Sequence, residues 1–372
     1  MDHELTRREF LEKTGVGAAA LAAGGIGWEF VRGLQAADAE EASTTADGAR
    51  LVPTTCLQCD GGCALVVKTV NGNAIKVDGN PLSPLNRGKS CLKAQAALQS
   101  LYDPDRLPGP RERTGERGSG QWRPLSWEAA LERVGEKLSE LRASGHPERL
   151  LFLQGRSRGQ MDTVIDRFCR SYGTPNNVTP ATICSEGFLI AQDLLQGIRT
   201  PLPYDWERCN YVLCFGAGFI ESWRPSVRLL QALTYMRTER PGQRAKLVQI
   251  EPRFSMTASK ADEWVPIRPG LDGALALGIA CVIVRDRLYD AEFVATRTFG
   301  FEDWKDAAGE THRGFKRYLL EKCRPEKVAE LTGVPEHVIE RLGREFATHR
   351  PAVAVGARGC RMHTNGLFNA MA

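Results

Sequence analysis

Four cysteines constrain the fold of this 372-residue chain more than any other feature. Cys56, Cys59 and Cys63 lie close together, and Cys91 follows after an intervening stretch. Because cysteine thiolates are the usual ligands of iron–sulfur centres, this spacing favours a 4Fe-4S cluster. A structural zinc site is the alternative, although zinc sites usually pair two short Cys-x2–4-Cys clips. The chain must therefore fold so that residue 91 returns to the 56–63 loop.

The stretch between the third and fourth cysteines predicts how they converge. Residues 64–70 and 73–77 have the composition of strands, and Asn71-Gly72 between them suits the positive φ angles of a type I′ turn. A helix is predicted over 92–101, directly after Cys91. A cluster at the start of this helix would lie near backbone N–H groups that favour negative charge.

These residues resemble those of the molybdopterin oxidoreductases, the dimethyl sulfoxide reductase family. The cysteine pattern, the stretch from Gly79 to Ala97 and the Tyr102–Leu107 segment carry the resemblance, which runs from about residue 50 to the end. It implies an α/β fold in which a small iron–sulfur domain with a β-hairpin occupies residues 49–105. Residues 106–372 would form α/β dinucleotide-binding domains with parallel sheets, and the C-terminal part of the family fold would be missing.

The same resemblance implies the cofactors. They would be a 4Fe-4S cluster and a bis-molybdopterin guanine dinucleotide carrying molybdenum or tungsten. Lys93, two residues after the fourth cysteine, occupies the family position that helps electrons pass between cluster and pterin.

The N-terminus predicts export. Arg7 and Arg8 precede a small apolar run over 16–27 that is too short to span a bilayer. A paired arginine before such a run indicates a twin-arginine signal, here assigned to residues 1–40, and a periplasmic location. The alternative is an ordinary amphipathic helix that contains two arginines.

Charge and cysteine usage exclude two classes of protein. The net charge is +4, and no basic block with interleaved aromatic residues is present, so nucleic acid is not expected as a partner. The 11 cysteines show no spacing typical of a disulfide framework.

The body of the chain alternates short apolar strands with amphipathic helices, which predicts parallel sheets covered by helices. Ser126 is the expected N-cap of a helix that follows it. The expected strands cover residues 149–154, 210–215, 246–250 and 351–355, and the expected helices cover 158–171, 225–237, 272–287 and 335–347.

Three residues near strand ends suit a dinucleotide. Gly216 and Gly218 follow the strand 210–215, where glycines let backbone amides approach a pyrophosphate, although the same pattern also serves as a plain tight turn. Glu251 follows the strand 246–250, where an acid commonly binds ribose hydroxyls. A solvated carboxylate is the alternative there.

The resemblance adds further cofactor-binding residues. Arg253 would neutralise phosphate, Gly270 and Asp272 lie in a stretch that binds guanine, and His363 lies in a cofactor and substrate loop. Taken alone, His363 fits a hydrogen-bonding loop residue better than a base.

Cys184 is the candidate metal ligand. It lies between a Gly/Pro/Asn-rich loop and a predicted helix, and a cysteine at a helix N-terminus is available as a thiolate. By position it matches the family residue that ligates molybdenum. The alternative, a small buried hydrophobic side chain, fits four other cysteines better, namely Cys169, Cys209, Cys214 and Cys281.

Arg156 follows the strand 149–154 and could attract an anionic substrate, or equally act as a phosphate clamp or a surface charge.

The implied function is two-electron redox chemistry on a small inorganic anion, with electrons relayed through the cluster. The first candidate substrate is a sulfur oxyanion or polysulfide. A serine ligand would have suggested sulfoxide and N-oxide reductases, and formate dehydrogenases place histidine where Ser185 stands. Respiratory arsenate or nitrate reductase-like activity and a non-catalytic electron-transfer subunit remain alternatives. The implied partners are a ferredoxin-like iron–sulfur subunit and a membrane anchor subunit.

Overall fold

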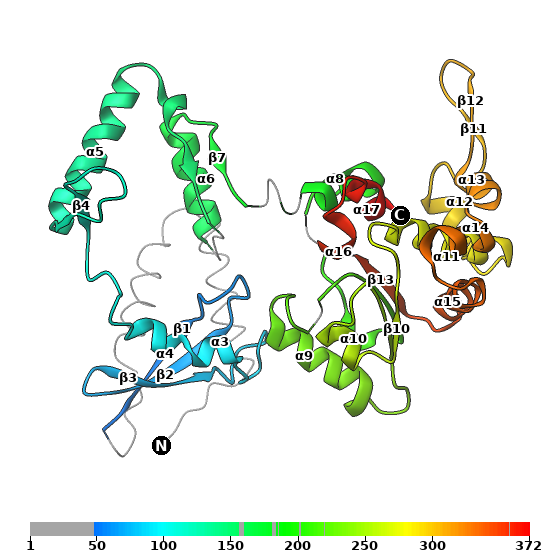
Figure 1. Ribbon diagram of the computed structural model, residues 1–372, viewed down its shortest axis with the longest axis horizontal. Coiled ribbons are helices and arrows are strands. Elements are labelled where there is room, and N and C mark those ends of the chain that lie inside the picture. The colour runs from blue at the N-terminus through cyan, green and yellow to red at the C-terminus, as the bar shows by residue number, and fades with distance from the viewer. Residues whose placement is uncertain are drawn as a thin grey trace, which may run out of the picture. The chain divides into compact units, whose positions relative to one another are not determined.

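The computed structural model describes residues 48–155, 160–180, 184, 186–200, 202–218, 220–356 and 358–372. Contacts divide the chain into two units (Figure 1). The first comprises Met1–Cys56 and Cys63–Arg106, and the second comprises Leu57–Gly62 and Leu107–Ala372. The predicted export signal over 1–40 and Arg156 lie outside the described residues.

The first unit is built on a three-stranded antiparallel sheet of order β1-β2-β3. Its strands are β1 (Arg50–Thr55), β2 (Ala64–Val70) and β3 (Asn73–Gly79). The β2–β3 hairpin confirms the prediction, because Asn71 and Gly72 have φ angles of 50° and 80°, as a type I′ turn requires.

The helix expected over 92–101 is interrupted. It forms two short helices, α3 (Leu92–Gln95) and α4 (Ala97–Leu101). Ala96 between them has a ψ of −5°, far from the value of about −42° in an α-helix, so the regular ladder breaks there.

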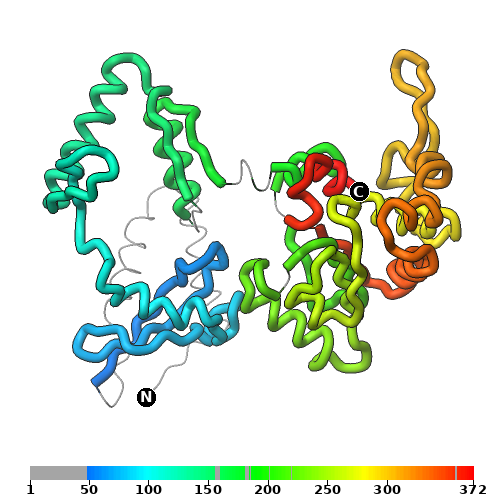
Figure 2. Tube along the Cα trace, viewed as in Figure 1, coloured from blue at the N-terminus to red at the C-terminus, as the bar shows by residue number. Residues whose placement is uncertain are grey.

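The second unit contains a four-stranded parallel sheet of order β10-β9-β8-β13. Its strands are β8 (Tyr211–Phe215), β9 (Lys246–Ile250), β10 (Glu263–Val265) and β13 (Ala352–Gly356). Three of them confirm predicted strands to within one residue. Every residue of β8 is buried, as expected for a parallel strand with helices on both faces. Figure 2 shows how β13, near the C-terminus, runs beside β8.

Helices cover both faces of this sheet. Val212 and Cys214 of β8 point into a core with α9 (Ser226–Thr234), which continues as a π-turn over Tyr235–Glu239. Tyr211, Leu213 and Phe215 point the other way, into a core with α11 (Asp272–Arg285), α14 (Pro325–Thr332) and α15 (Glu336–Thr348). The alternation along β8 follows from the period-2 geometry of a strand. The helices expected over 225–237, 272–287 and 335–347 are thus confirmed in outline.

A smaller α/β element precedes this sheet. Strands β6 (Phe152–Leu153) and β7 (Asn177–Val178) pair in parallel, with α6 (Met161–Tyr172) between them in the chain. The strand expected over 149–154 is shorter than predicted because Pro147–Arg149 forms a 3-10 turn. Helix α5 (Trp127–Ala143) begins as predicted, and the Ser126 hydroxyl accepts a hydrogen bond from the Ala129 N–H at 3.2 Å.

The remaining elements are short. They are β4 (Arg111–Arg113), β5 (Trp122–Pro124), β11 (Trp304–Lys305), β12 (Thr311–His312), α8 (Glu186–Gln196), α10 (Met256–Lys260), α12 (Ala291–Arg297), α13 (Phe315–Lys322), α16 (Arg358–Arg361) and α17 (Gly366–Met371). Among the described helices, none combines the length and apolar character needed to cross a bilayer.

Candidate functional site

Three of the four predicted cluster cysteines share one small core in the first unit. Cys56 is buried there, with Cys63 and Cys91 packed against the same cluster of residues, which includes Leu65 and Ala94. The Cys56 N–H donates to the Cys63 carbonyl oxygen at 2.8 Å, which closes the loop between them. None of these three cysteines forms a disulfide. The first unit therefore gathers the sulfur donors that the hairpin was predicted to bring together.

The Asn86 side chain connects two parts of the backbone: the turn that leads to Cys91 and the strand that follows Cys63. Its side chain is fully buried. The amide nitrogen donates to the carbonyl oxygens of Ala64 at 2.9 Å and Lys89 at 2.7 Å, and the amide oxygen accepts from the Ala64 N–H at 3.2 Å. Sequence reasoning gave Asn86 no role, since only the folded turn shows which backbone groups the amide satisfies.

Gly79 explains how closely the same turn packs. A Cβ atom at this position would lie 2.6 Å from the carbonyl carbon of Lys89. No side chain fits at that distance, so glycine lets the end of β3 lie directly against the turn before Cys91.

Cys59, the fourth predicted ligand, and Lys93, the predicted electron relay, are not members of this core cluster. Cys59 belongs to the loop Leu57–Gly62, which by its contacts is part of the second unit. Its sulfur accepts a hydrogen bond from the Gly61 N–H at 3.4 Å. Lys93 is exposed on α3 in the first unit.

Cys184, the candidate metal ligand, lies just before α8 and is half-buried. The charge of Arg361 interacts with this thiol. The pKa of Arg361 falls below its ordinary value because burial penalises the guanidinium, while the negative charge available at Cys360, Cys184 and Tyr204 opposes that shift. The guanidinium also lies over the Phe188 ring, 5.0 Å from its centroid.

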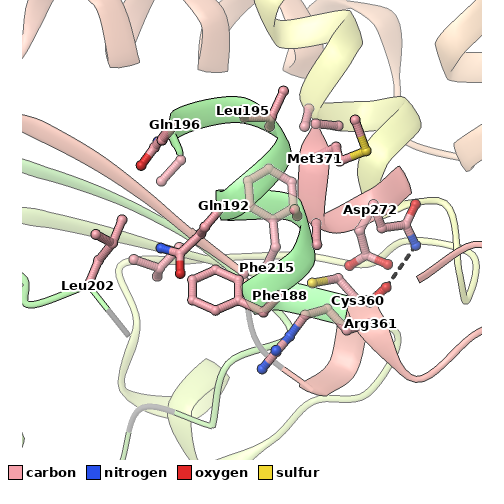
Figure 3. A pocket seen from close by; sticks show the side chains of 18 of the residues that line it. Phe188, Gln192, Leu195, Gln196, Leu202, Phe215, Asp272, Cys360, Arg361 and Met371 are labelled. Atoms are coloured by element: carbon pink, nitrogen blue, oxygen red, sulfur yellow. Dashed lines mark hydrogen bonds between the residues drawn. The ribbon is translucent and has the colours of Figure 1, made fainter. Parts of the chain in front are cut away.

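Arg361 and Phe188 belong to the wall of a pocket of about 260 Å³ (Figure 3). The wall is mainly apolar, with contributions from α8, α16, α17 and the ends of β8 and β13. Gln192, although only 5% exposed, has no hydrogen-bond partner for either its amide nitrogen or its amide oxygen among the described residues. Such an amide calls for a polar ligand, because an unpaired buried polar group costs stability.

Gly216 is the point where two strand ends meet. It follows β8 with a φ of 58°, and its carbonyl oxygen accepts from the Gly359 N–H at 3.2 Å. A Cβ atom on Gly216 would lie 2.8 Å from the Gly359 Cα. Both the backbone conformation and the close approach therefore require glycine.

Replacing Gly216 by alanine should lower the free energy of unfolding by about 3 kcal/mol, from the left-handed backbone and the enforced collision. Urea denaturation, monitored by tryptophan fluorescence, measures this loss in the free energy of unfolding. Gly242 is the matched control, because its φ is 83° but a Cβ there would meet nothing within 4 Å. Gly242→Ala should cost only about 1 kcal/mol; equal losses for the two variants would contradict the close-contact argument.

Three other predicted residues lie near the carboxyl ends of β8 and β9. A Cβ on Gly218 would lie 3.3 Å from the Glu221 carboxyl carbon. Glu251 is buried, and its carboxylate accepts from the Ser255 N–H at 3.3 Å, so it supports the turn before α10. Arg253 is largely exposed, with its guanidinium 3.7 Å from a Glu221 oxygen.

Gly270, Asp272 and His363 form a second group at the start of α11. The His363 ring packs against Gly270, whose φ is 80° and whose Cβ would lie 3.4 Å from the ring. The amide nitrogens of Asn365 and Asn369 donate to the Gly270 carbonyl oxygen at 2.8 and 3.1 Å. Burial raises the pKa of Asp272, opposed by a backbone hydrogen bond and by His363.

The predicted dinucleotide-binding residues thus form separate groups, and only some of them line the pocket that contains Arg361. Asp272 reaches the same pocket as Arg361, whereas Glu251 and Arg253 do not line it. Arg361 and Gln192 were missed by sequence reasoning. The only signal for Arg361 was its place in the predicted cofactor loop near His363, and nothing in the sequence marked Gln192.

Comparisons with known proteins place these residues in context. The Molybdopterin oxidoreductase family matches residues 106–372, and the Molybdopterin oxidoreductase Fe4S4 domain matches residues 49–103. The thiosulfate reductase molybdopterin-containing subunit PhsA of Salmonella typhimurium is 31% identical over 354 residues, which are 94% of this chain and 43% of the relative.

Two further proteins are similar. The arsenate respiratory reductase molybdopterin-containing subunit ArrA of a Shewanella species is 30% identical over 386 residues, covering 99% of this chain and 44% of the relative. Among solved structures, acetylene hydratase from Pelobacter acetylenicus matches with a TM-score of 0.68 and 26% identity, covering 86% of this chain and 42% of that chain. The chain spans less than half the length of the curated relatives it matches here.

Proposed function

The chain belongs to the molybdopterin oxidoreductase family, and we propose that it forms the cluster-binding and dinucleotide-binding part of an enzyme that reduces a small sulfur oxyanion or polysulfide. Its cofactors are a 4Fe-4S cluster and a molybdopterin. The substrate class follows the relative named as a thiosulfate reductase, and the relative named as an arsenate reductase makes arsenate the second candidate.

The described residues fit both cofactors. The N-terminal cysteines form no disulfide, and soft thiolate ligands suit an iron–sulfur cluster. The glycine-lined end of β8 and the unpartnered amide of Gln192 suit a cofactor rich in polar groups. When bound, the molybdenum cofactor supplies a centre that exchanges two electrons with substrate.

We assign the chain's own residues as follows. Cys184 holds the metal, and Lys93 lies on the path of electrons between pterin and cluster. The groups that hold the cluster are Cys56, Cys59, Cys63 and Cys91, and those that bind the dinucleotides are Gly216, Gly218, Glu251, Arg253, Gly270, Asp272 and His363. Arg156, outside the described residues, is kept as a second candidate for substrate attraction.

The structural observation that supports an anionic substrate is the position of Arg361. This partly buried cation belongs to the pocket wall, lies over the Phe188 ring and interacts electrostatically with Cys184. A guanidinium in low dielectric attracts an oxyanion more strongly than one in bulk water and presents a fork of N–H donors. An anionic substrate beside the proposed metal ligand would therefore meet a compensating charge.

We also propose export and partners. The Arg7-Arg8 pair with its following apolar run supports export by the twin-arginine route to the periplasm. A ferredoxin-like iron–sulfur subunit and a membrane anchor subunit would pass electrons to the cluster, since a cluster carries electrons and does not itself generate them.

Substrate-dependent oxidation of a reduced viologen dye tests the proposal. The protein is purified anaerobically with its cofactors, and thiosulfate, polysulfide, arsenate and dimethyl sulfoxide are offered separately at equal concentration. We expect the two sulfur anions to give the highest kcat/KM. Faster turnover of arsenate would favour the second candidate, and no turnover of any anion by protein that contains molybdenum would contradict an anion reductase.

A further inference from the structure

The loop that carries Cys59 is held by the segment that begins α9. By its contacts this loop, Leu57–Gly62, belongs to the second unit. The Asp60 carboxylate forms an ion pair with the Arg224 guanidinium, and both side chains are partly shielded from water, at 41% and 30% exposure. Arg224 immediately precedes Pro225, the N-cap of α9.

Gly61 brings the loop into direct contact with that segment. A Cβ atom on Gly61 would lie 3.0 Å from the Pro225 Cβ and 3.2 Å from the Cys59 sulfur. The Gly61 N–H donates to the Cys59 sulfur at 3.4 Å. Pro225 therefore lies close to the residue whose amide is bonded to the thiol, and it leaves little room for a side chain at position 61.

We propose that Arg224 is a positioning residue that, with Asp60 and Pro225, seats the Cys59 loop and sets the reduction potential of the cluster that Cys59 helps to hold. The proposal rests on the cluster assigned above. Reduction potentials of iron–sulfur clusters depend on net charge nearby and on hydrogen bonds to the sulfur atoms. The loop contacts supply both factors.

The two charges act in opposite directions. Reduction adds one electron to the cluster, so a positive charge nearby favours the reduced form and a negative charge disfavours it. Asp60 is the chain neighbour of Cys59, and Arg224 is its ion-pair partner. Replacing Arg224 by a neutral residue removes a positive charge beside the Cys59 loop, whereas replacing Asp60 removes a negative charge from it.

Redox titration of the purified, cluster-containing chain, monitored by electron paramagnetic resonance of the reduced cluster, tests the proposal. Arg224→Gln should make the midpoint potential more negative, and Asp60→Asn should make it more positive. At a fixed potential, each should change the ratio of reduced to oxidised cluster threefold or more, a shift of about 28 mV for a one-electron couple. Iron per chain should stay at the wild-type level in both variants.

Arg228→Gln is the matched control. Arg228 lies on α9, just after Arg224 and Pro225, is similarly exposed at 27%, and forms its ion pair, at 2.7 Å, with Glu207 rather than with a residue of the cysteine loop. Its loss should leave the potential unchanged.

The outcomes separate this proposal from the one on which it rests. Wild-type protein that purifies without iron would remove the cluster and this role of Arg224 together. Iron-replete variants whose potentials do not move, or move in the same direction for Arg224→Gln and Asp60→Asn, would overturn the role of Arg224 alone.

Discussion

Replacing Cys91 by alanine is expected to remove the 4Fe-4S cluster from the first unit. A cubane cluster normally needs four thiolates, and the remaining three cannot supply the missing bond. Iron should fall from about four atoms per chain to less than one, and the visible charge-transfer absorption should disappear. Iron analysis and absorption spectra of anaerobically purified protein measure both.

Among the four cysteines, Cys91 gives the most stringent test, because its position depends on the whole hairpin. The chain must leave Cys63, turn at Asn71-Gly72 and return through the turn held by Asn86. Cys323→Ala is the control, since Cys323 is equally a free cysteine but is buried in a separate core beside α13. A full iron content in Cys91→Ala, or zinc in place of iron in the wild type, would contradict the cluster assignment.

The elements that sequence reasoning predicted well are those fixed by local chemistry or continuous burial. The Asn71-Gly72 turn follows from two residues that tolerate positive φ. Strand β8 follows from an unbroken apolar run, as expected of a parallel strand buried on both faces, and β9 follows from an apolar run that only Gln249 interrupts after Lys246.

Other elements depend on contacts that a single stretch of sequence does not reveal. Strand β1 was not predicted, because only one of its residues is even half-buried and Pro53 lies inside it, as on an edge strand. The break at Ala96 has no glycine or proline to announce it.

The candidate site likewise contains residues that the local sequence predicts and residues that only distant contacts identify. The cysteines could be chosen from spacing alone, because metal ligands must come in sets of a suitable residue type. Arg361 and Gln192 could not, since each acquires its meaning from residues far away in the chain: Arg361 from Phe188, and Gln192 from the pocket that buries its amide without a partner. Arginine is common in this sequence, and only the folded chain shows that Arg361 belongs to the pocket wall.

Replacing Cys184 by alanine is expected to abolish turnover in protein that still carries its iron. Mutating groups that merely orient a metal ligand costs about 10- to 100-fold in metal affinity or activity, so loss of the ligand itself should exceed about 100-fold in kcat. Dye-linked turnover with thiosulfate and molybdenum analysis by mass spectrometry provide the measurements. Iron per chain should not change, because the cluster cysteines lie elsewhere in the chain.

Cys169→Ala provides the matched control for that experiment. Cys169 lies on α6, is only 2% exposed, and has a raised pKa because of burial, as expected of a thiol that packs as a small hydrophobic group. Its replacement should lower stability by about 1 kcal/mol through lost packing and leave kcat within about twofold. Turnover that survives Cys184→Ala but not Cys169→Ala would reverse the assignment. If Cys184→Ala loses turnover and molybdenum while Cys169→Ala keeps both, the thiol beside Arg361 is the protein's own ligand to the metal.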